Sequence, residues 1–256
     1  MTIALGPEQV EALFDDGFIR VPDVFDEAEL REMRAAFDRL RRTAEKLGAS
    51  GLHAGAHFVV GRLGRDGKEE RTVIHRVAWC GAAEPVLADY GRDPRLVSMA
   101  AALLGSPRMT QLINQAHFKM PGDGVAFPWH QDSSHRRYGT EWSDVNGRGS
   151  YVQTVTALDD VDAENGPLRF IPGTGRIGHL DLEPGKPLPA SIDPARAVAP
   201  ALTAGSVLLF GPYTVHMSEP NRSTRPRRAF LNGYAYPGAY RRIYPGAGAG
   251  RRLVAS

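Results

Sequence analysis

Short strand-like runs dominate the chain beyond residue 108, and they constrain its fold more than any other feature. Each run is apolar or alternates apolar with polar residues, and Gly, Pro or Asn separates it from the next. The runs cover 109–120, 125–131, 150–158, 167–171, 199–210 and 227–236. Because several short strands divided by turn residues are typical of a β-sandwich or barrel, the sequence predicts an all-β core over this part of the chain.

The preceding hundred residues have a helical pattern instead. Residues 7–16 and 26–47 carry apolar side chains three and four positions apart, and a glycine follows each segment. One or two further helices are predicted over 84–105, and a short strand over 18–22. The glycine-rich, charged segment 51–70 is predicted to be a mobile connection. Helices followed by strands indicate a mainly β fold that is buttressed by N-terminal helices.

The length and composition fit one globular domain over residues 1–256. We expect a helical layer mostly over 7–105, a β core mostly over 109–236 and a flexible tail over 237–256. Hydrophobic residues make up 42% of the chain and charged residues 23%, which is ordinary for a soluble protein. The formal net charge of +2 gives no indication of nucleic-acid binding.

Other features of the sequence predict a cytoplasmic location. Cys80 is the single cysteine, so an intrachain disulfide is impossible and a reducing compartment fits. The first residues lack a basic and then apolar secretory signal, and no segment approaches the roughly 18 to 20 apolar residues of a membrane span. We therefore expect no membrane partner. The sequence does not indicate an oligomeric state.

Two histidines and one carboxylate form the strongest chemical signal. His130 and Asp132 stand two positions apart in a run that the sequence predicts to be extended, so their side chains project from the same face. His216 follows 86 residues later, at the end of another strand-like run. Two histidines and a carboxylate are the facial triad of non-haem iron(II) oxygenases, which leaves metal positions open for a cosubstrate and dioxygen. About one His-x-acid pair is expected by chance in such a chain, so the pair alone is weak.

A basic residue that could bind a cosubstrate follows His216 a short way along the chain. Arg227 opens the strand-like run 227–236, and a hairpin to the strand that carries His216 would return this residue to the metal. A guanidinium suits the far carboxylate of a dicarboxylate cosubstrate because it offers paired donors in a fixed fork. Ser218 could share that carboxylate, and Arg228 is the alternative if the strand faces the other way.

At this point the sequence resembles the phytanoyl-CoA dioxygenase family of iron(II)- and 2-oxoglutarate-dependent oxygenases. The resemblance spans roughly residues 5–236. The motifs that carry it are Phe118-Lys119-x-Pro121-Gly122, Trp129-His130-Gln131-Asp132, Ala157-Leu158-Asp159-Asp160, Glu164-Asn165-Gly166-Pro167-Leu168, Ile171-Pro172-Gly173 and the segment from His216 to Arg227. One departure is the Thr174-Gly175 that follows the last glycine, where the family commonly has Ser-His.

The resemblance implies a double-stranded β-helix (jelly roll), with His130, Asp132 and His216 as ligands of Fe(II). It implies that Arg227, helped by Ser218, pairs with the distal carboxylate of 2-oxoglutarate, and that Lys119 approaches the same cosubstrate. Related halogenases lack the carboxylate ligand, so Asp132 argues against halogenation. The implied reaction is oxidation of a C–H bond by dioxygen, with release of succinate and carbon dioxide.

The resemblance leaves the substrate and the outcome open. The substrate is expected to be a small molecule, and the polar segment 133–149 favours a specialised metabolite over an acyl-CoA ester. Hydroxylation, desaturation and ring closure share the same metal ligands. Candidate substrate contacts are His117, His135, Tyr138, Trp142 and Gln153. The alternatives are an acyl-CoA hydroxylase of the same family, an enzyme that does not use 2-oxoglutarate, and a jelly-roll module that binds metal and ligand without turnover.

Overall fold

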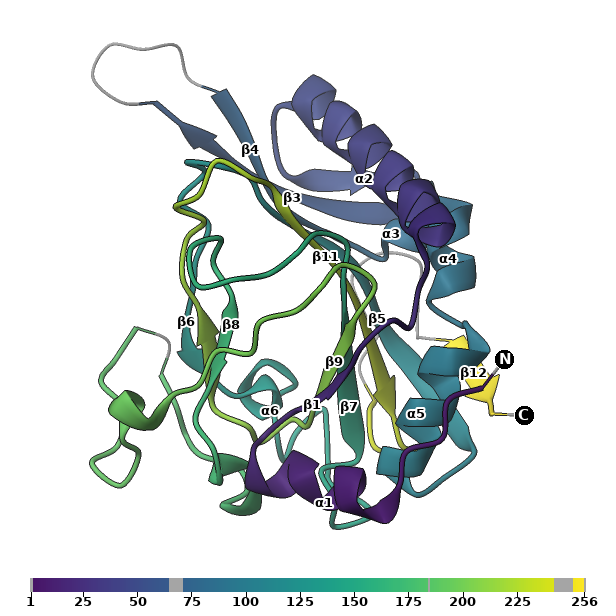
Figure 1. Ribbon diagram of the computed structural model, residues 1–256, viewed down its shortest axis with the longest axis vertical. Helices are drawn as coiled ribbons and strands as arrows, with labels where there is room; N and C mark the ends of the chain where they lie inside the picture. Colours follow the sequence, from purple (N-terminus) through teal and green to yellow (C-terminus); the bar gives the residue numbers. More distant parts are fainter. Residues whose placement is uncertain (1, 65–70, 184, 242–250, 256) are drawn as a thin grey trace.

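A computed structural model describes residues 2–64, 71–183, 185–241 and 251–255 of the chain. Two β-sheets face each other, and helices cover the outer side of the larger sheet (Figure 1). The predicted jelly roll with N-terminal helices is therefore confirmed. Within the described residues, no helix is both long and apolar enough to cross a membrane.

The larger sheet has nine strands in the order β1-β9-β7-β11-β5-β4-β3-β2, and β12 also pairs with β5. Its strands are β1 (Ile19–Val21), β2 (Gly51–His53), β3 (Ala56–Leu63), β4 (Arg71–Ala78), β5 (Arg108–Lys119), β7 (Tyr151–Ala157), β9 (Val207–Phe210), β11 (Arg227–Ala235) and β12 (Arg251–Val254). All of their pairings are antiparallel. The predicted strands over 18–22, 109–120, 150–158 and 227–236 correspond to β1, β5, β7 and β11. β9 forms the end of the predicted run 199–210.

The smaller sheet has three strands in the order β6-β10-β8. Its strands are β6 (Phe127–His130), β8 (Leu168–Phe170) and β10 (His216–Ser218). His216 is the Cα partner of His130 on one side of β10 and of Phe170 on the other. The central strand of this sheet therefore brings the two predicted metal-binding histidines into register.

The helices and short turns lie mostly outside the β core. They are α1 (Pro7–Asp15), α2 (Glu27–Leu47), α3 (Cys80–Ala83), α4 (Pro85–Tyr90), α5 (Pro94–Leu104), α6 (Asp132–His135) and the 3-10 turns η1 (Thr174–Arg176) and η2 (Pro194–Arg196). The helices predicted over 7–16, 26–47 and 84–105 are confirmed. Asp26 caps α2 by accepting hydrogen bonds from the amides of Ala28 and Glu29, and Gly48 ends this helix in the left-handed conformation.

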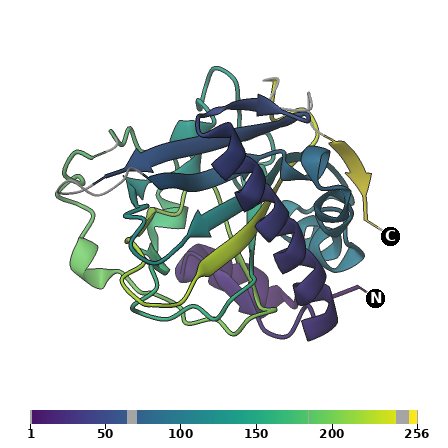
Figure 2. The same cartoon turned by 90° about the horizontal axis from the view of Figure 1, so that it is seen from above.

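The main hydrophobic core lies between these helices and the larger sheet. Phe37 of α2 packs on Phe118 of β5, with ring centroids 5.1 Å apart, and on Phe230 of β11 at 6.5 Å. Figure 2 shows α2 lying along the face of the larger sheet that the helices cover. Side chains alternate across a strand, so the neighbours of Phe118 and Phe230 project from the opposite face, toward the smaller sheet. A second cluster, which includes Val155, Leu208 and Phe210, fills part of that inner space.

Two of the predictions for whole segments are wrong. Residues 51–63, predicted to belong to a mobile connection, form β2 and β3, and β4 follows as an unpredicted strand; residues 65–70 lie outside the described part of the chain. The tail predicted over 237–256 contains β12, which pairs with Arg108–Gln111 of β5. Residues 242–250 of that tail also lie outside the described part. β2 lies at one edge of the larger sheet with β3 and β4 next to it, and the charged and glycine-containing residues of 51–70 gave no clear strand pattern.

The predicted hairpin between the strands of His216 and Arg227 is also wrong. The chain leaves the larger sheet after Phe210, enters the smaller sheet at His216 and returns to the larger sheet at Arg227. The two residues therefore face each other from opposite sheets. They reach the same cavity across the space between the sheets.

Candidate active site

One cavity of about 360 Å³ lies between the two sheets. Such a volume is typical of sites for small organic ligands. Polar and charged residues make up one part of its lining, and apolar residues make up the rest. The lining residues are Arg76, Ile113, Gln115, His117, Phe127, His130, Asp132, His135, Arg136, Gln153, Val155, Leu168, Phe210, His216, Ser218, Arg227 and Leu231.

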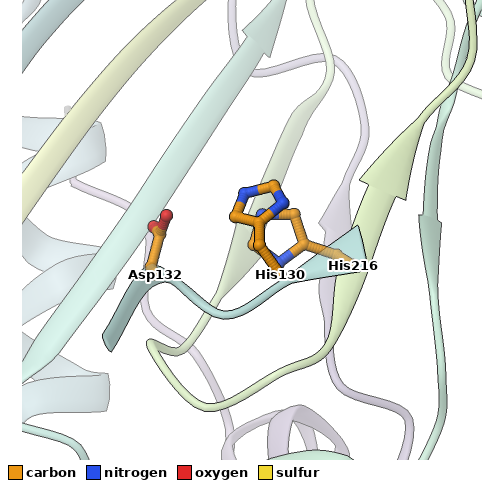
Figure 3. Close-up of side chains that lie close together, drawn as sticks. All are labelled: His130, Asp132 and His216. Atoms are coloured by element: carbon orange, nitrogen blue, oxygen red, sulfur yellow. The ribbon is translucent and has the colours of Figure 1, made fainter. Parts of the chain in front are cut away.

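His130, Asp132 and His216 come together at one side of this cavity. One potential ligand atom from each residue lies within 4.8 Å of the others (Figure 3). His130 ends β6, and His216 begins β10 beside it. Asp132 is the first residue of α6 rather than part of a longer strand. The intervening Gln131 is extended, with φ −114° and ψ 143°, so the predicted projection of both residues to one side still holds.

Backbone carbonyls fix the orientation of both imidazole rings. The Nδ1 atom of His130 lies 2.7 Å from the carbonyl oxygen of Pro128, and the Nδ1 atom of His216 lies 2.8 Å from that of Thr214. A carbonyl only accepts hydrogen bonds, so each Nδ1 carries the proton and each Nε2 keeps its lone pair. Burial lowers the pKa of His216 to about 3, which keeps this ring neutral. Both rings are thus prepared to bind a metal through Nε2.

A buried arginine supports the carboxylate. Nη2 of Arg136 lies 3.6 Å from Oδ2 of Asp132 and donates a hydrogen bond of 2.6 Å to the Tyr151 hydroxyl. The guanidinium also lies over the Tyr151 ring, 4.0 Å from its centroid. Burial alone would raise the pKa of Asp132, but the charge of Arg136 and the nearby histidines hold this pKa below its usual range. Asp132 is therefore an ionised ligand candidate.

The two neighbouring arginines of β11 have different surroundings. Arg227 lines the cavity and is only 5% exposed, and its Nε atom has no hydrogen-bond partner among the described residues. Burial lowers its pKa to about 10. Arg228 projects from the opposite face and forms a bidentate pair with Asp159, including a contact of 2.8 Å from Nη2. The side chain that can meet a ligand is therefore that of Arg227.

Lys119 lies behind the cavity wall rather than in it. Its ammonium donates a hydrogen bond of 2.8 Å to the Ser218 hydroxyl and further ones to the carbonyls of Glu219 and Gly166. Burial and the charge of Arg227 lower its pKa to about 6. Ser218 itself lines the cavity. The structure thus places Lys119 in contact with the predicted cosubstrate contact Ser218, one layer away from the cavity.

The structure divides the predicted substrate contacts into two groups. His117, His135 and Gln153 line the cavity. Tyr138 and Trp142 do not belong to the lining: Tyr138 stacks on His179 with ring centroids 4.4 Å apart, and Trp142 is buried in a cluster with Leu112, Ile113 and Tyr151. The reason is that the chain turns away from the metal after α6, so only the first turn of segment 133–149 faces the cavity.

Sequence reasoning missed two cationic residues of the cavity. Arg76 lies on β4, a strand that follows the glycine-rich, charged segment 51–70 and was not predicted. Arg136 lies four residues after Asp132, a spacing that places the two on one helix face. A helix prediction over residues 132–135 would have revealed this second pair, but four residues are too few for a periodic signal.

The residues that line the cavity fit both of the predicted ligands, Fe(II) and 2-oxoglutarate. Two imidazoles and one ionised carboxylate, gathered on one side of a cavity, are the donor set of non-haem Fe(II) centres. The buried Nε of Arg227, which lacks a partner among the described residues, fits the carboxylate of a dicarboxylate such as 2-oxoglutarate.

Comparisons with known proteins agree with this geometry. The sequence profile of the phytanoyl-CoA dioxygenase (PhyH) family matches residues 14–229. L-proline trans-4-hydroxylase from Streptomyces griseoviridis is 25% identical over 247 residues, covering 86% of this chain and 82% of the relative. Ectoine dioxygenase from Bordetella bronchiseptica is 26% identical over 245 residues, covering 88% of this chain and 73% of the relative.

Solved structures show the same fold. The 2-oxoglutarate-dependent carbocyclase SnoK from nogalamycin biosynthesis superposes with a TM-score of 0.72 at 22% identity, covering 99% of this chain and 100% of the neighbour. The epimerase SnoN, in complex with Fe³⁺, 2-oxoglutarate and nogalamycin RO, gives a TM-score of 0.70 at 22% identity, covering 96% of this chain and 94% of the neighbour.

Proposed function

This chain belongs to the phytanoyl-CoA dioxygenase family of iron- and 2-oxoglutarate-dependent oxygenases, and on that premise we propose how its cavity works. The protein is an enzyme that oxidises a C–H bond of a small molecule with Fe(II), 2-oxoglutarate and dioxygen. When bound, Fe(II) and 2-oxoglutarate would activate dioxygen, which oxidises both the substrate and 2-oxoglutarate, and the latter would leave as succinate and carbon dioxide. The residues of this chain supply binding, orientation and protection from water.

In this proposal His130, Asp132 and His216 bind the Fe(II). The carbonyls of Pro128 and Thr214 hold both imidazoles in the tautomer that presents Nε2. Arg136 keeps Asp132 ionised and restrains one of its oxygens. These contacts position the ligands before the metal arrives, which reduces the ordering cost of binding.

Arg227 binds the distal carboxylate of 2-oxoglutarate. The Ser218 hydroxyl completes this contact, because Lys119 already donates to its oxygen and leaves its proton for another acceptor. Lys119 is then a positioning residue that acts through Ser218. Apolar residues close the remaining wall, among them Val155, Leu168 and Phe210. They limit the access of water to the reacting C–H bond.

We propose a small polar metabolite as the substrate, oxidised by hydroxylation or oxidative cyclisation. A cavity of about 360 Å³ fits a molecule of that size, and the relatives are named for proline and ectoine. We further propose that one catalytic domain carries the whole activity and acts in the cytoplasm. Support for the location comes from the sole cysteine, Cys80, which is buried and unpaired.

The observation that carries the mechanism is the pairing of the metal-ligand cluster with the buried, unpartnered Nε of Arg227 in one cavity. The test is an anaerobic titration of Fe(II)-loaded protein with 2-oxoglutarate, followed by its metal-to-ligand charge-transfer absorption. We expect a saturable band in the wild type, no band in His216→Ala and a much higher dissociation constant in Arg227→Ala.

Arg225→Ala is the matched control, because Arg225 is an exposed arginine two residues away that pairs with Asp162. This variant should bind 2-oxoglutarate as the wild type does. Exposure of the loaded protein to air should then produce succinate. Absence of the band from wild-type protein that contains stoichiometric Fe(II) would contradict the proposed site and favour a module that binds a ligand without turnover.

A further inference from the structure

We propose that Arg76 forms a second anion-binding site in the cavity, and that the substrate carries a carboxylate, phosphonate or phosphate group which Arg76 binds. This inference rests on the proposed function, since it assigns the first arginine, Arg227, to 2-oxoglutarate. It narrows the substrate to an anionic or zwitterionic molecule.

The position of Arg76 supports a role in ligand binding. Arg76 lies on β4, where it is the Cα partner of His117 on β5, and both side chains line the cavity. Arg76 is half-buried, and it forms no hydrogen bond or ion pair with any residue in the described part of the chain. By contrast, Arg71 on the same strand pairs with Asp123, and other part-buried arginines such as Arg95 and Arg228 have acidic partners. A guanidinium turned toward a cavity without a partner is suited to bind an anion.

The charges of the lining residues lead to the same conclusion. Among the described residues that line the cavity, Asp132 is the only acidic one, whereas three are arginines. Arg136 is paired with Asp132, and Arg227 is assigned to the distal carboxylate of 2-oxoglutarate. Burial and the charges of Arg76 and Arg227 lower the pKa of His117 well below its usual value, so this ring is neutral. Among the described residues Arg76 has no acidic partner, and the distal carboxylate of 2-oxoglutarate is assigned to Arg227.

The backbones of Arg76 and Arg227 lie at separate positions on the larger sheet. β4 and β11 lie on opposite sides of β5, so the two backbones are about 10 Å apart across the sheet. Arg76 is level with His117 and Arg227 with Lys119, which adds about 7 Å along the strands. The cavity therefore has two separate cationic positions on the larger sheet.

The surroundings of Arg76 indicate what the rest of the substrate looks like. On its side of the cavity, His117 accepts or donates a hydrogen bond of 2.9 Å with Gln115 and lies against Phe127, with ring centroids 5.6 Å apart. Beside His216 the Phe210 ring supplies an apolar part of the lining, with ring centroids 4.6 Å apart, whereas the polar His135 and Arg136 lie beside His130 and Asp132. This arrangement fits a substrate with an anionic group at one end and an aliphatic part near the metal.

One other carboxylate could reach Arg76, namely the carboxylate of 2-oxoglutarate that lies next to its keto group. The experiment must therefore separate the cosubstrate from the substrate. Its first part titrates anaerobic Fe(II) protein with 2-oxoglutarate in the wild type, Arg76→Gln, Arg76→Lys and Arg252→Gln. Arg252 is the matched control because it is an exposed arginine on β12. We expect all four dissociation constants to agree within about threefold.

The second part measures binding of small anions to the Fe(II)–2-oxoglutarate protein by thermal unfolding, at fixed pH and ionic strength. The probes are acetate, butyrate, benzoate and methylphosphonate, compared with acetamide, butyramide, benzamide and dimethyl methylphosphonate. In the wild type we expect at least one anion to bind tenfold or more tightly than its neutral counterpart. Arg76→Gln should reduce this preference to less than threefold, whereas Arg76→Lys and Arg252→Gln should keep it.

Each other outcome overturns the inference. A tenfold loss of 2-oxoglutarate affinity in Arg76→Gln would assign Arg76 to the cosubstrate. Equal binding of anions and neutral probes, or no binding of any anion, would show that the cavity does not select anions. A preference that survives Arg76→Gln would place the anion elsewhere, for example on the metal itself. Lack of a charge-transfer band in the wild type is a different failure, since it would contradict the proposed function before Arg76 is tested.

Discussion

The buried charge of Arg227 has opposite effects on the stability of the ligand-free protein and on the binding of a carboxylate. Its guanidinium is buried, and burial lowers its pKa to about 10, so the folded protein without ligand bears the cost of an uncompensated charge. The same isolation makes the group an effective partner for a carboxylate that arrives with its own charge. One residue therefore destabilises the empty enzyme and stabilises the complex.

We predict that Arg227→Met separates these two effects. The dissociation constant for 2-oxoglutarate should rise by 30-fold or more, since loss of one partner of a buried charge pair costs about 2 to 5 kcal/mol. The free energy of unfolding of the metal-free variant should instead increase by about 1 to 2 kcal/mol, because an apolar side chain replaces an unpaired buried cation. Urea unfolding and anaerobic titration measure the two quantities. A variant that is less stable than the wild type would refute this account.

His216 makes the stability of the metal-free protein depend on pH. Burial lowers its folded-state pKa to about 3, whereas the unfolded histidine has a pKa of about 6.5. Between these values the unfolded state binds the extra proton, so stability falls as the pH falls from about 6.5 toward 3.

In the metal-free His216→Gln variant, we predict that the free energy of unfolding falls less steeply between pH 6.5 and 4.5 than in the wild type. The difference between the two slopes should be up to about 1.4 kcal/mol per pH unit. Urea unfolding in the presence of a chelator, at several pH values, measures the slope. A slope as steep as that of the wild type would show that other groups account for the acid sensitivity.

At the scale of elements, the sequence predicted those with strong periodicity and missed those at sheet edges. The helix at 27–47 has apolar residues at regular intervals, a capping aspartate and a terminal glycine, so its signals agree. β3 and β4 lack such agreement, because they lie toward one edge of the sheet and carry charged and partly exposed residues. β12 is four residues long and is recognisable only from its pairing with β5.

The cap of α2 offers a test at this scale. Asp26 accepts two backbone hydrogen bonds, and the Glu29 carboxylate accepts one from the amide of Asp26. Asp26→Ala should lower the free energy of unfolding by about 1 kcal/mol. Asp26→Asn should lose less, because it keeps an acceptor. The dissociation constant for 2-oxoglutarate should not change in either variant, since α2 lies on the outer face of the sheet. A large change in this constant would indicate that the helix controls the cavity.

At the scale of the whole molecule, the candidate active site lies between the two sheets and is lined by residues of both. The histidine ligands come from the smaller sheet, and both cavity-facing arginines of the larger sheet lie opposite them. Sequence motifs led to the prediction of His130, Asp132 and His216 as metal ligands and of Arg227 as a cosubstrate contact, because each lies in a motif of characteristic spacing, and all four residues line the same cavity. They could not predict Arg76, whose role depends on the position of β4 relative to β5 and on the lack of an acidic neighbour in the described part of the fold.

We predict that the ligands stabilise the fold in two ordered steps. Fe(II) at 100 times its dissociation constant should add about 2.7 kcal/mol to the free energy of unfolding, or roughly 5 to 10 °C in Tm. 2-Oxoglutarate should add a second increment only after the metal, since it needs both the metal and Arg227. Anaerobic thermal unfolding with and without a chelator measures both steps. In Arg227→Met the first increment should remain and the second should shrink; loss of both would point to general misfolding.

The division of the cavity between two sheets has a consequence for how such an enzyme changes over generations. In the proposed mechanism the Fe(II) ligands lie on β6, β10 and α6, whereas Arg76, the proposed substrate contact, belongs to β4, which supplies none of these ligands. Substitutions on β4 can therefore alter which molecule is accepted while the oxidative chemistry is inherited intact. A lineage with this architecture can acquire new substrates through one strand, and a laboratory library aimed at new substrates should begin there.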